Sequence, residues 1–154
     1  AMKTRSGFTM IEILIVVVLL GVLAAIVAPK FSSATLDSQT TVLRRDLQTV
    51  RTQIALYQHY HNGALPAGPG DTEEDFVRRM TTQTDLVGNP GTEFGPYMLR
   101  VPINPFTSTR TIRVGGVPAG ADTHAWRFDP NSGWFQSDDN FDANNDGRAD
   151  HLTF

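Results

Sequence analysis

An unbroken apolar run near the N-terminus constrains this chain more than any other feature. Residues 8–28 read FTMIEILIVVVLLGVLAAIVA, and Glu12 carries the only charge among them. At about 1.5 Å per residue, a helix of this length spans roughly 30 Å, the thickness of a bilayer's hydrocarbon core. The preceding segment carries Lys3 and Arg5 and no acid, and basic residues favour the cytoplasmic side. The pattern predicts a single membrane helix over residues 8–29 with the rest of the chain exported.

Two ordinary interpretations of this run compete with a functional one. A cleaved secretory signal would end in a small-residue site, which Ala24-Ala25 and Ala28 permit, but Pro29-Lys30 follows and the helical pattern then resumes. A plain signal anchor explains everything except Glu12. A carboxylate within an apolar run costs about 3 kcal/mol by insertion scales, unless it sits shallow at the interface, and it marks a functional site by default.

The start of the run carries a recognisable signal. The stretch Gly7-Phe8-Thr9-Met10-Ile11-Glu12, between a short basic leader and an apolar helix, resembles the class III signal of type IV prepilins and type II secretion pseudopilins. The resemblance implies that residues 1–7 are a leader, that a prepilin peptidase cuts between Gly7 and Phe8, and that the new amine of Phe8 is methylated. It also implies that subunits leave the inner membrane and stack into a filament. The partners would then be copies of this chain, other pseudopilins and an inner-membrane assembly platform.

The lone acid fits such a filament. A carboxylate buried among packed helices needs a partner. No Lys, Arg or His occurs from Phe8 to Pro29, so the nearest cation is the amine that cleavage creates on Phe8. We expect Glu12 to pair with that amine, within one chain or between subunits, and an intermolecular pair would set the axial register.

The helix is predicted to continue over residues 30–61 as an amphipathic segment. Its apolar positions recur at helical spacing: Leu36, Leu43, Leu47, Val50, Ile54 and Tyr57. Asn62-Gly63 supplies the end signal. Gly21 and Pro29 match places where pilin helices bend or melt in fibres, although Pro29 is equally compatible with a tolerated kink at the membrane boundary.

Residues 62–154 are predicted to form a periplasmic α+β domain, in which the long helix packs on a small antiparallel sheet. Residues 71–74 resemble a capping box that opens a helix to about Thr82. Candidate strands cover residues 97–101, 111–117, 125–128 and 133–136. Residues 95–98 and 101–106 resemble the G-P-Y-L…P-x-D-P-W segment of major pseudopilins, with Asn104 for Asp and Phe106 for Trp.

The acidic stretch near the C-terminus predicts a calcium loop. Asp142, Asn144 and Asp146 alternate before Gly147, as in the first half of an EF-hand loop, and Asp150 follows at the ninth position. Asp138 and Asp139 are weaker candidates. Thr153 stands where the bidentate Glu would be, so this is not an EF-hand, and a solvated acidic turn is the alternative. The resemblance agrees with calcium, because major pseudopilins bind it in this part of the domain.

Composition narrows the function classes. The formal charge of −3 argues against a nucleic-acid binder, and the absence of cysteine excludes disulfides and thiolate chemistry. No hydrolase, zinc-protease or phosphate-binding motif occurs, and the four histidines are expected at the surface or at helix ends. The sequence therefore predicts a non-enzymatic pseudopilus subunit. The alternatives are a type IV pilin of a surface fibre, a minor pseudopilin, or an anchored calcium-dependent module that never polymerises.

Overall fold

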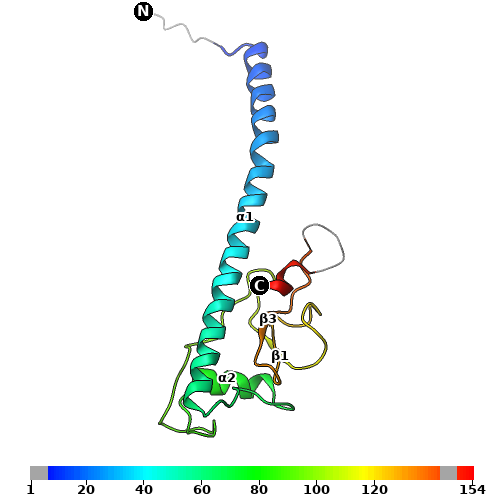
Figure 1. Ribbon diagram of the computed structural model, residues 1–154. Coiled ribbons are helices and arrows are strands. Elements are labelled where there is room, and N and C mark those ends of the chain that lie inside the picture. The colour runs from blue at the N-terminus through cyan, green and yellow to red at the C-terminus, as the bar shows by residue number, and fades with distance from the viewer. Residues whose placement is uncertain (1–6, 143–148) are drawn as a thin grey trace, which may run out of the picture. The chain divides into compact units, whose positions relative to one another are not determined.

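The computed structural model describes residues 7–142 and 149–154, including their side chains except those of residues 28–33 and 152–153. The elements follow the order α1, α2, β1, β2, β3 and the 3₁₀ helix η1 (Asp150–Thr153) (Figure 1). The chain divides into two compact units, one ending at Ser38 and the other running from Gln39 to Phe154. Helices and a short sheet in one chain confirm the predicted α+β class.

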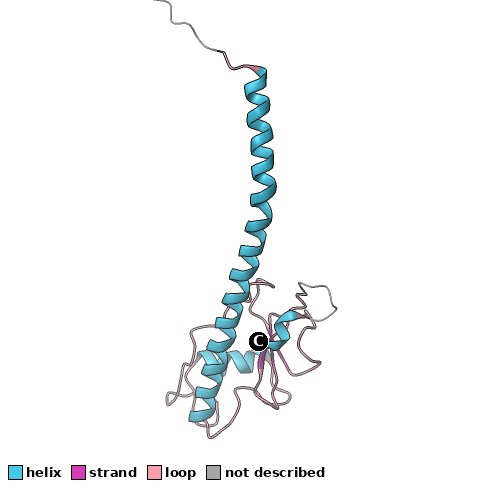
Figure 2. Ribbon diagram, turned by 45° about the horizontal axis from the view of Figure 1, so that its top comes forward, coloured by secondary structure: helices cyan, strands magenta, loops and turns pink. Residues whose placement is uncertain are grey.

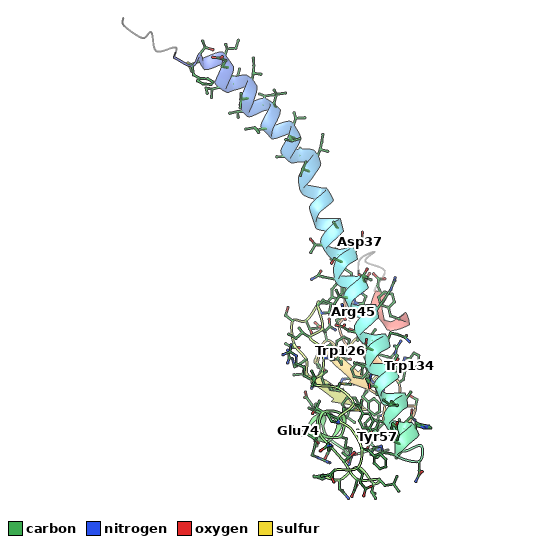
Figure 3. The ribbon with its side chains drawn as sticks, turned by 90° about the vertical axis from the view of Figure 1, so that its left-hand side faces the viewer. Asp37, Arg45, Tyr57, Glu74, Trp126 and Trp134 are labelled. Atoms are coloured by element: carbon green, nitrogen blue, oxygen red, sulfur yellow. The ribbon has the colours of Figure 1, made fainter. Side chains whose placement is uncertain are left out.

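Helix α1 (Met10–Tyr60) begins in the first unit with the predicted apolar span. Residues Met10–Val27 have a mean hydropathy of 3.1 and the length to cross a membrane. Their large side chains are exposed, from 38% at Val27 to 93% at Met10, and they project from the helix on all sides (Figure 3). A helix that is apolar all round and uncovered requires lipid or other helices as its surroundings.

The later part of α1, from Gln39 onward, supplies one wall of the core in the second unit. The predicted stripe is confirmed at Leu43, Leu47, Val50, Ile54 and Tyr57, whose side chains are all at most 2% exposed. Leu36, the first member of the predicted stripe, lies in the first unit and is 38% exposed. The stripe that packs on the domain therefore starts one heptad later than the sequence pattern indicates.

Helix α1 ends at Tyr60, close to the predicted end signal. Asn62 and Gly63 both have positive φ, at 53° and 85°, and the Gly63 amide donates to the Gln58 carbonyl at 2.8 Å. His61 follows the helix directly but is buried, at 2% exposure. Its Nδ1 donates to the Tyr57 carbonyl at 2.9 Å and its Nε2 accepts from the Thr84 hydroxyl at 3.0 Å, so this histidine anchors the next loop.

The second helix, α2 (Glu73–Thr81), confirms the predicted helix with its cap displaced by one residue. Thr72 is the N-cap, and Asp75 completes the capping box with it. Asp71 instead accepts from the Gly68 amide at 2.8 Å and from Arg79. Phe76 and Met80 of this helix are buried, while Val77 is only half-buried.

The sheet has three short strands: β1 (Ile112–Val114), β2 (Trp126–Phe128) and β3 (Phe135–Ser137) (Figure 2). They fall within or beside the predicted strands. The β2–β3 pair is antiparallel, with Phe128 opposite Phe135, but β1 runs parallel to β2, with Ile112 opposite Trp126. The prediction of an antiparallel sheet was wrong for β1, because the 11 residues between β1 and β2 return the chain to the same end of the sheet.

One of the four predicted strands, the one over residues 97–101, does not form. The amides of Tyr97 and Met98 both donate to the Met80 carbonyl, at 3.0 Å, instead of joining a neighbouring strand. This segment thereby closes the C-terminal end of α2. Leu99, next along the chain, is 94% exposed.

The core lies between α1, α2 and the sheet of the second unit. Its largest side chains are aromatic: Tyr57, Phe76, Trp126, Phe128 and Phe135. Trp134 lies at the surface (Figure 3). The guanidinium of Arg51, from α1, stacks on it 4.2 Å from the ring centroid. Arg51 also donates to the Phe135 carbonyl at 2.9 Å and to the Phe154 carbonyl, so it ties the end of the described chain to the helix.

Candidate functional site

The predicted processing and assembly residues gather at the start of α1. Gly7 and Phe8 precede the helix and belong to no helix or strand, and the Phe8 side chain is 79% exposed. Glu12 lies in the first helical turn. A peptidase that cuts before Phe8 would meet an uncovered peptide bond here.

Glu12 has a local partner that the sequence analysis did not identify. The amide and the hydroxyl of Thr9 both donate to Glu12 Oε2 at 3.0 Å, and the Glu12 amide donates to Thr9 Oγ1 at 3.3 Å. Thr9 and Glu12 thus form a reciprocal capping box. The signal was present in the sequence as T-x-x-E, which is typical of a helix start.

This cap changes how the lone acid is accommodated. Two donors on Thr9 satisfy one carboxylate oxygen, which reduces the cost of an acid at the edge of an apolar span. Oε1 accepts no hydrogen bond from the described residues. The geometry leaves one face of the carboxylate available to a cation, such as the amine that cleavage would create on Phe8.

The predicted flexibility positions lie within a continuous helix. The backbone is helical at both Gly21 and Pro29. A Cβ added at Gly21 would meet no atom within 4 Å, so packing within this chain does not require glycine there. Their role in an assembled fibre stays a prediction.

The predicted calcium ligands are only partly within the described chain. Asn144 and Asp146 fall in 143–148, outside the described residues, while Asp142 and Asp150 flank that segment. The Asp150 amide donates to the Phe141 carbonyl at 2.8 Å, which brings the two ends of the loop together. Among the residues that the structure describes, no group of three or more His, Cys, Asp or Glu is arranged to hold a metal ion.

Asp138 and Asp139, the weaker candidates, already have protein partners. Asp138 is fully buried and forms an ion pair with Arg113. Asp139 accepts from His151 Nδ1 at 2.7 Å and from the Ser137 hydroxyl. Burial raises the pKa of the Asp139 carboxyl. The hydrogen bonds from His151 and Ser137 lower this pKa by more than burial raises it, so it lies below its ordinary value.

The expectation that every histidine lies at the surface or at a helix end was therefore wrong for His151. This side chain is 2% exposed, and Phe141 stacks on its ring with centroids 5.1 Å apart. No local pattern in the sequence links His151 to Asp139, because the two residues are brought together only by the fold.

Residues 2–28 match the family described as the prokaryotic N-terminal methylation motif. The chain is 29% identical over 139 residues to the type II secretion system core protein G of Pseudomonas aeruginosa, covering 88% of this chain and 92% of that protein. It is 37% identical to fimbrial protein Q of Moraxella bovis and 39% identical to a fimbrial protein of P. aeruginosa. These two matches cover 54% and 56% of this chain and about half the length of each relative.

No solved structure matches this chain significantly. The sequence matches nevertheless agree with the features at both ends of the molecule. The methylation motif covers the Gly7–Phe8 junction and Glu12, and the similarity to protein G covers 88% of this chain. Together they show that the chain is similar to pseudopilins and to other type IV pilin-like proteins.

Proposed function

We propose that this chain is a structural subunit of a type II secretion pseudopilus. The observation that carries the proposal is the extent of the similarity to core protein G, which covers nine-tenths of that protein, whereas the fimbrial similarities cover about half of each relative. The long apolar span, exposed on all sides, is the surface through which copies of this chain pack.

The proposed life cycle starts in the inner membrane. The basic leader stays in the cytoplasm, the apolar span crosses the bilayer, and the domain from Gln39 onward lies in the periplasm. A prepilin peptidase removes residues 1–7 and methylates Phe8. The subunit then joins other pseudopilins on an assembly platform, and the growing filament supports protein export.

Two measurements test this proposal. N-terminal mass spectrometry of the protein from sheared filaments is expected to find methylated Phe8 as the first residue. A deletion strain is expected to lose secretion of folded proteins and to retain twitching. Protein that keeps residues 1–7 in filaments, or a deletion that abolishes twitching and leaves secretion intact, contradicts the proposal.

The second candidate is a type IV pilin of a surface fibre. The fimbrial relatives favour it, since they reach 37–39% identity over their matched regions, which is higher than the 29% for protein G. The deletion experiment separates the two functions, because only the fibre role predicts loss of twitching or adhesion.

We also propose that the loop between Asp142 and Asp150 binds calcium. The loop's ends meet through the Asp150–Phe141 hydrogen bond, and carboxylate and amide oxygens suit this cation. Asp142, Asn144, Asp146 and Asp150 would supply the ligands. We leave Asp138 and Asp139 out of this ligand set, because Asp138 forms an ion pair with Arg113 and Asp139 accepts a hydrogen bond from His151.

A further inference from the structure

A cavity of about 660 Å³, with both polar and apolar side chains in its lining, lies on the second unit. Three stretches distant in sequence line it: residues 106–111, 122–124 and 139–141. Four of the lining side chains are threonines, at positions 107, 109, 111 and 123. Its size falls within the range of small-molecule sites.

Buried polar side chains hold the first and third of these stretches in place. Asn104 is fully buried, and its Nδ2 donates to the Ala125 carbonyl at 2.9 Å and to the Ser137 hydroxyl at 2.7 Å. The same Asn104 fixes the stretch at 106–111, since its Oδ1 accepts from the Phe106 amide at 2.8 Å. Asp139 accepts a hydrogen bond from the Ser137 hydroxyl and another from the Phe141 amide at 3.2 Å, and so fixes the stretch at 139–141.

A second buried group holds the stretch at 122–124. Asp138 accepts from the Thr123 hydroxyl at 3.3 Å and pairs with Arg113. Arg113 in turn donates to the carbonyls of Gly115 at 3.0 Å and Val117 at 2.7 Å, which are part of the loop that leads to this wall. Cavity walls fixed by buried hydrogen bonds form a preorganised site, and preorganisation lowers the entropic cost of binding.

The chemistry of the lining selects the class of ligand. No Lys or Arg lines the cavity among the described residues, so it lacks the cations that bind phosphate or carboxylate. The threonine hydroxyls already have hydrogen-bond partners within the protein. An apolar ligand would, however, displace water from the side chains of Asp122 and Asn140 and offer no partner in its place, which is costly. A metal ion would find both oxygens of Asp139 already hydrogen-bonded.

The remaining class is a neutral polyhydroxylated molecule. Hydroxyl groups donate and accept at once, and so do the threonine side chains, while Asp122 accepts and His124 offers a ring nitrogen. The half-buried rings of Phe106 and Phe141, with centroids 4.8 Å apart, give an aromatic surface on the same cavity. A pyranose presents this same combination, with an apolar C–H face and a rim of hydroxyls.

We infer that this cavity binds a neutral sugar residue. The inference is independent of the proposed polymerisation, because every residue in it belongs to the second unit. It concerns a site on the surface of each subunit that recognises glycan.

The test uses the full chain in a zwitterionic detergent without a sugar head group. Glucose, galactose and N-acetylglucosamine are titrated separately and followed by saturation-transfer NMR. At least one of the three is expected to bind saturably. Failure of all three to bind overturns the inference and leaves the proposed filament role untouched.

Two variants and one control locate the binding. Thr109→Trp places an indole in the cavity from an exposed position and is expected to abolish binding, whereas Thr92→Trp, at an exposed threonine outside the cavity, is expected to leave it unchanged. Asp122→Asn keeps a side chain that tolerates the positive φ of 55° at this position, and is expected to weaken binding about 5-fold. Equal binding by the two tryptophan variants shows adventitious contact elsewhere and overturns the inference.

Discussion

Thr9 and Glu12 cap one another at the first turn of α1, with the Thr9 amide and hydroxyl each 3.0 Å from the same carboxylate oxygen. Glu12 therefore caps the helix, and in the proposed filament it would also be the charged partner of the amine that cleavage creates on Phe8. The two roles respond differently to substitution, since glutamine preserves the cap and lacks the charge.

Two single substitutions separate these roles. Glu12→Gln keeps an acceptor for Thr9 and removes the charge, so we expect normal cleavage and about a tenfold or greater loss of filaments. Thr9→Ala removes the cap and keeps the charge, and we expect assembly close to the unsubstituted chain. Immunoblots of leader removal and counts of sheared filaments measure both steps. The opposite pattern, with Thr9→Ala failing and Glu12→Gln assembling, would assign Glu12 to capping alone.

The buried pair Arg113–Asp138 is expected to contribute strongly to stability. Asp138 is fully buried and the Arg113 side chain is only 14% exposed. Asp138→Asn therefore leaves the Arg113 guanidinium without an opposite charge at a site where water solvates it poorly. We expect the free energy of unfolding to fall by about 3 kcal/mol. Urea unfolding followed by tryptophan fluorescence measures it.

The matched control for this pair is Arg45→Gln. Arg45 pairs with Asp46 at 2.9 Å but its side chain is 70% exposed, so its loss is expected to cost less than about 0.5 kcal/mol. Equal losses for the two substitutions would show that burial does not govern these pairs.

Asp71 is expected to make stability depend on acid pH. The Gly68 amide, followed by the Arg79 guanidinium, holds the pKa of Asp71 below its ordinary value of 3.8. A lowered folded pKa gives stability that is fully present above pH 4 and is lost as the pH falls through the folded pKa. Asp71→Asn is therefore expected to cost about 1 kcal/mol at pH 7 and progressively less below pH 4.

The comparison is made by urea unfolding from about pH 7 to pH 2.5. Glu93→Gln is the control, because the Glu93 side chain is exposed and makes no hydrogen bond to the described residues. A difference between Asp71→Asn and the unsubstituted chain that persists undiminished at the lowest pH would contradict the assignment.

Calcium is expected to raise the melting temperature of the domain. A cation that binds only the folded state stabilises it by mass action, and saturating calcium is expected to add about 5 °C or more. The double substitution Asp146→Asn with Asp150→Asn removes two proposed ligand charges and is expected to abolish the increase. Thermal unfolding with calcium, with magnesium and with a chelator measures this, and identical curves in all three would reject the loop as a calcium site.

Features encoded by local periodicity were predictable from the sequence. The buried stripe from Leu43 to Tyr57 follows helical spacing. A capping motif in the sequence indicates the start of α2, although Thr72 and Asp75 form this cap in place of residues 71 and 74. Local patterns also located the three strands. They do not encode which strands pair, and so the parallel pairing of β1 with β2 was missed.

Features that depend on tertiary contacts were not predictable. The network of Asn104, Ser137, Asp139 and His151 joins residues from three parts of the chain, and none of them stands out in sequence as a buried polar group. Residues 97–101 have strand-like composition, yet the amides of Tyr97 and Met98 donate to the last turn of α2. In both places long-range hydrogen bonding overrides the local preference.

The contacts of Arg51 join α1 to residues that are synthesised much later. Phe135 lies 84 positions and Phe154 103 positions further along the chain, so α1 is synthesised long before either residue can reach it. Until then the part of its apolar stripe that the sheet covers stays exposed. Each new chain therefore passes through an interval in which it is vulnerable to proteases and to wrong association, and this interval ends only when residues 135–154 have been made.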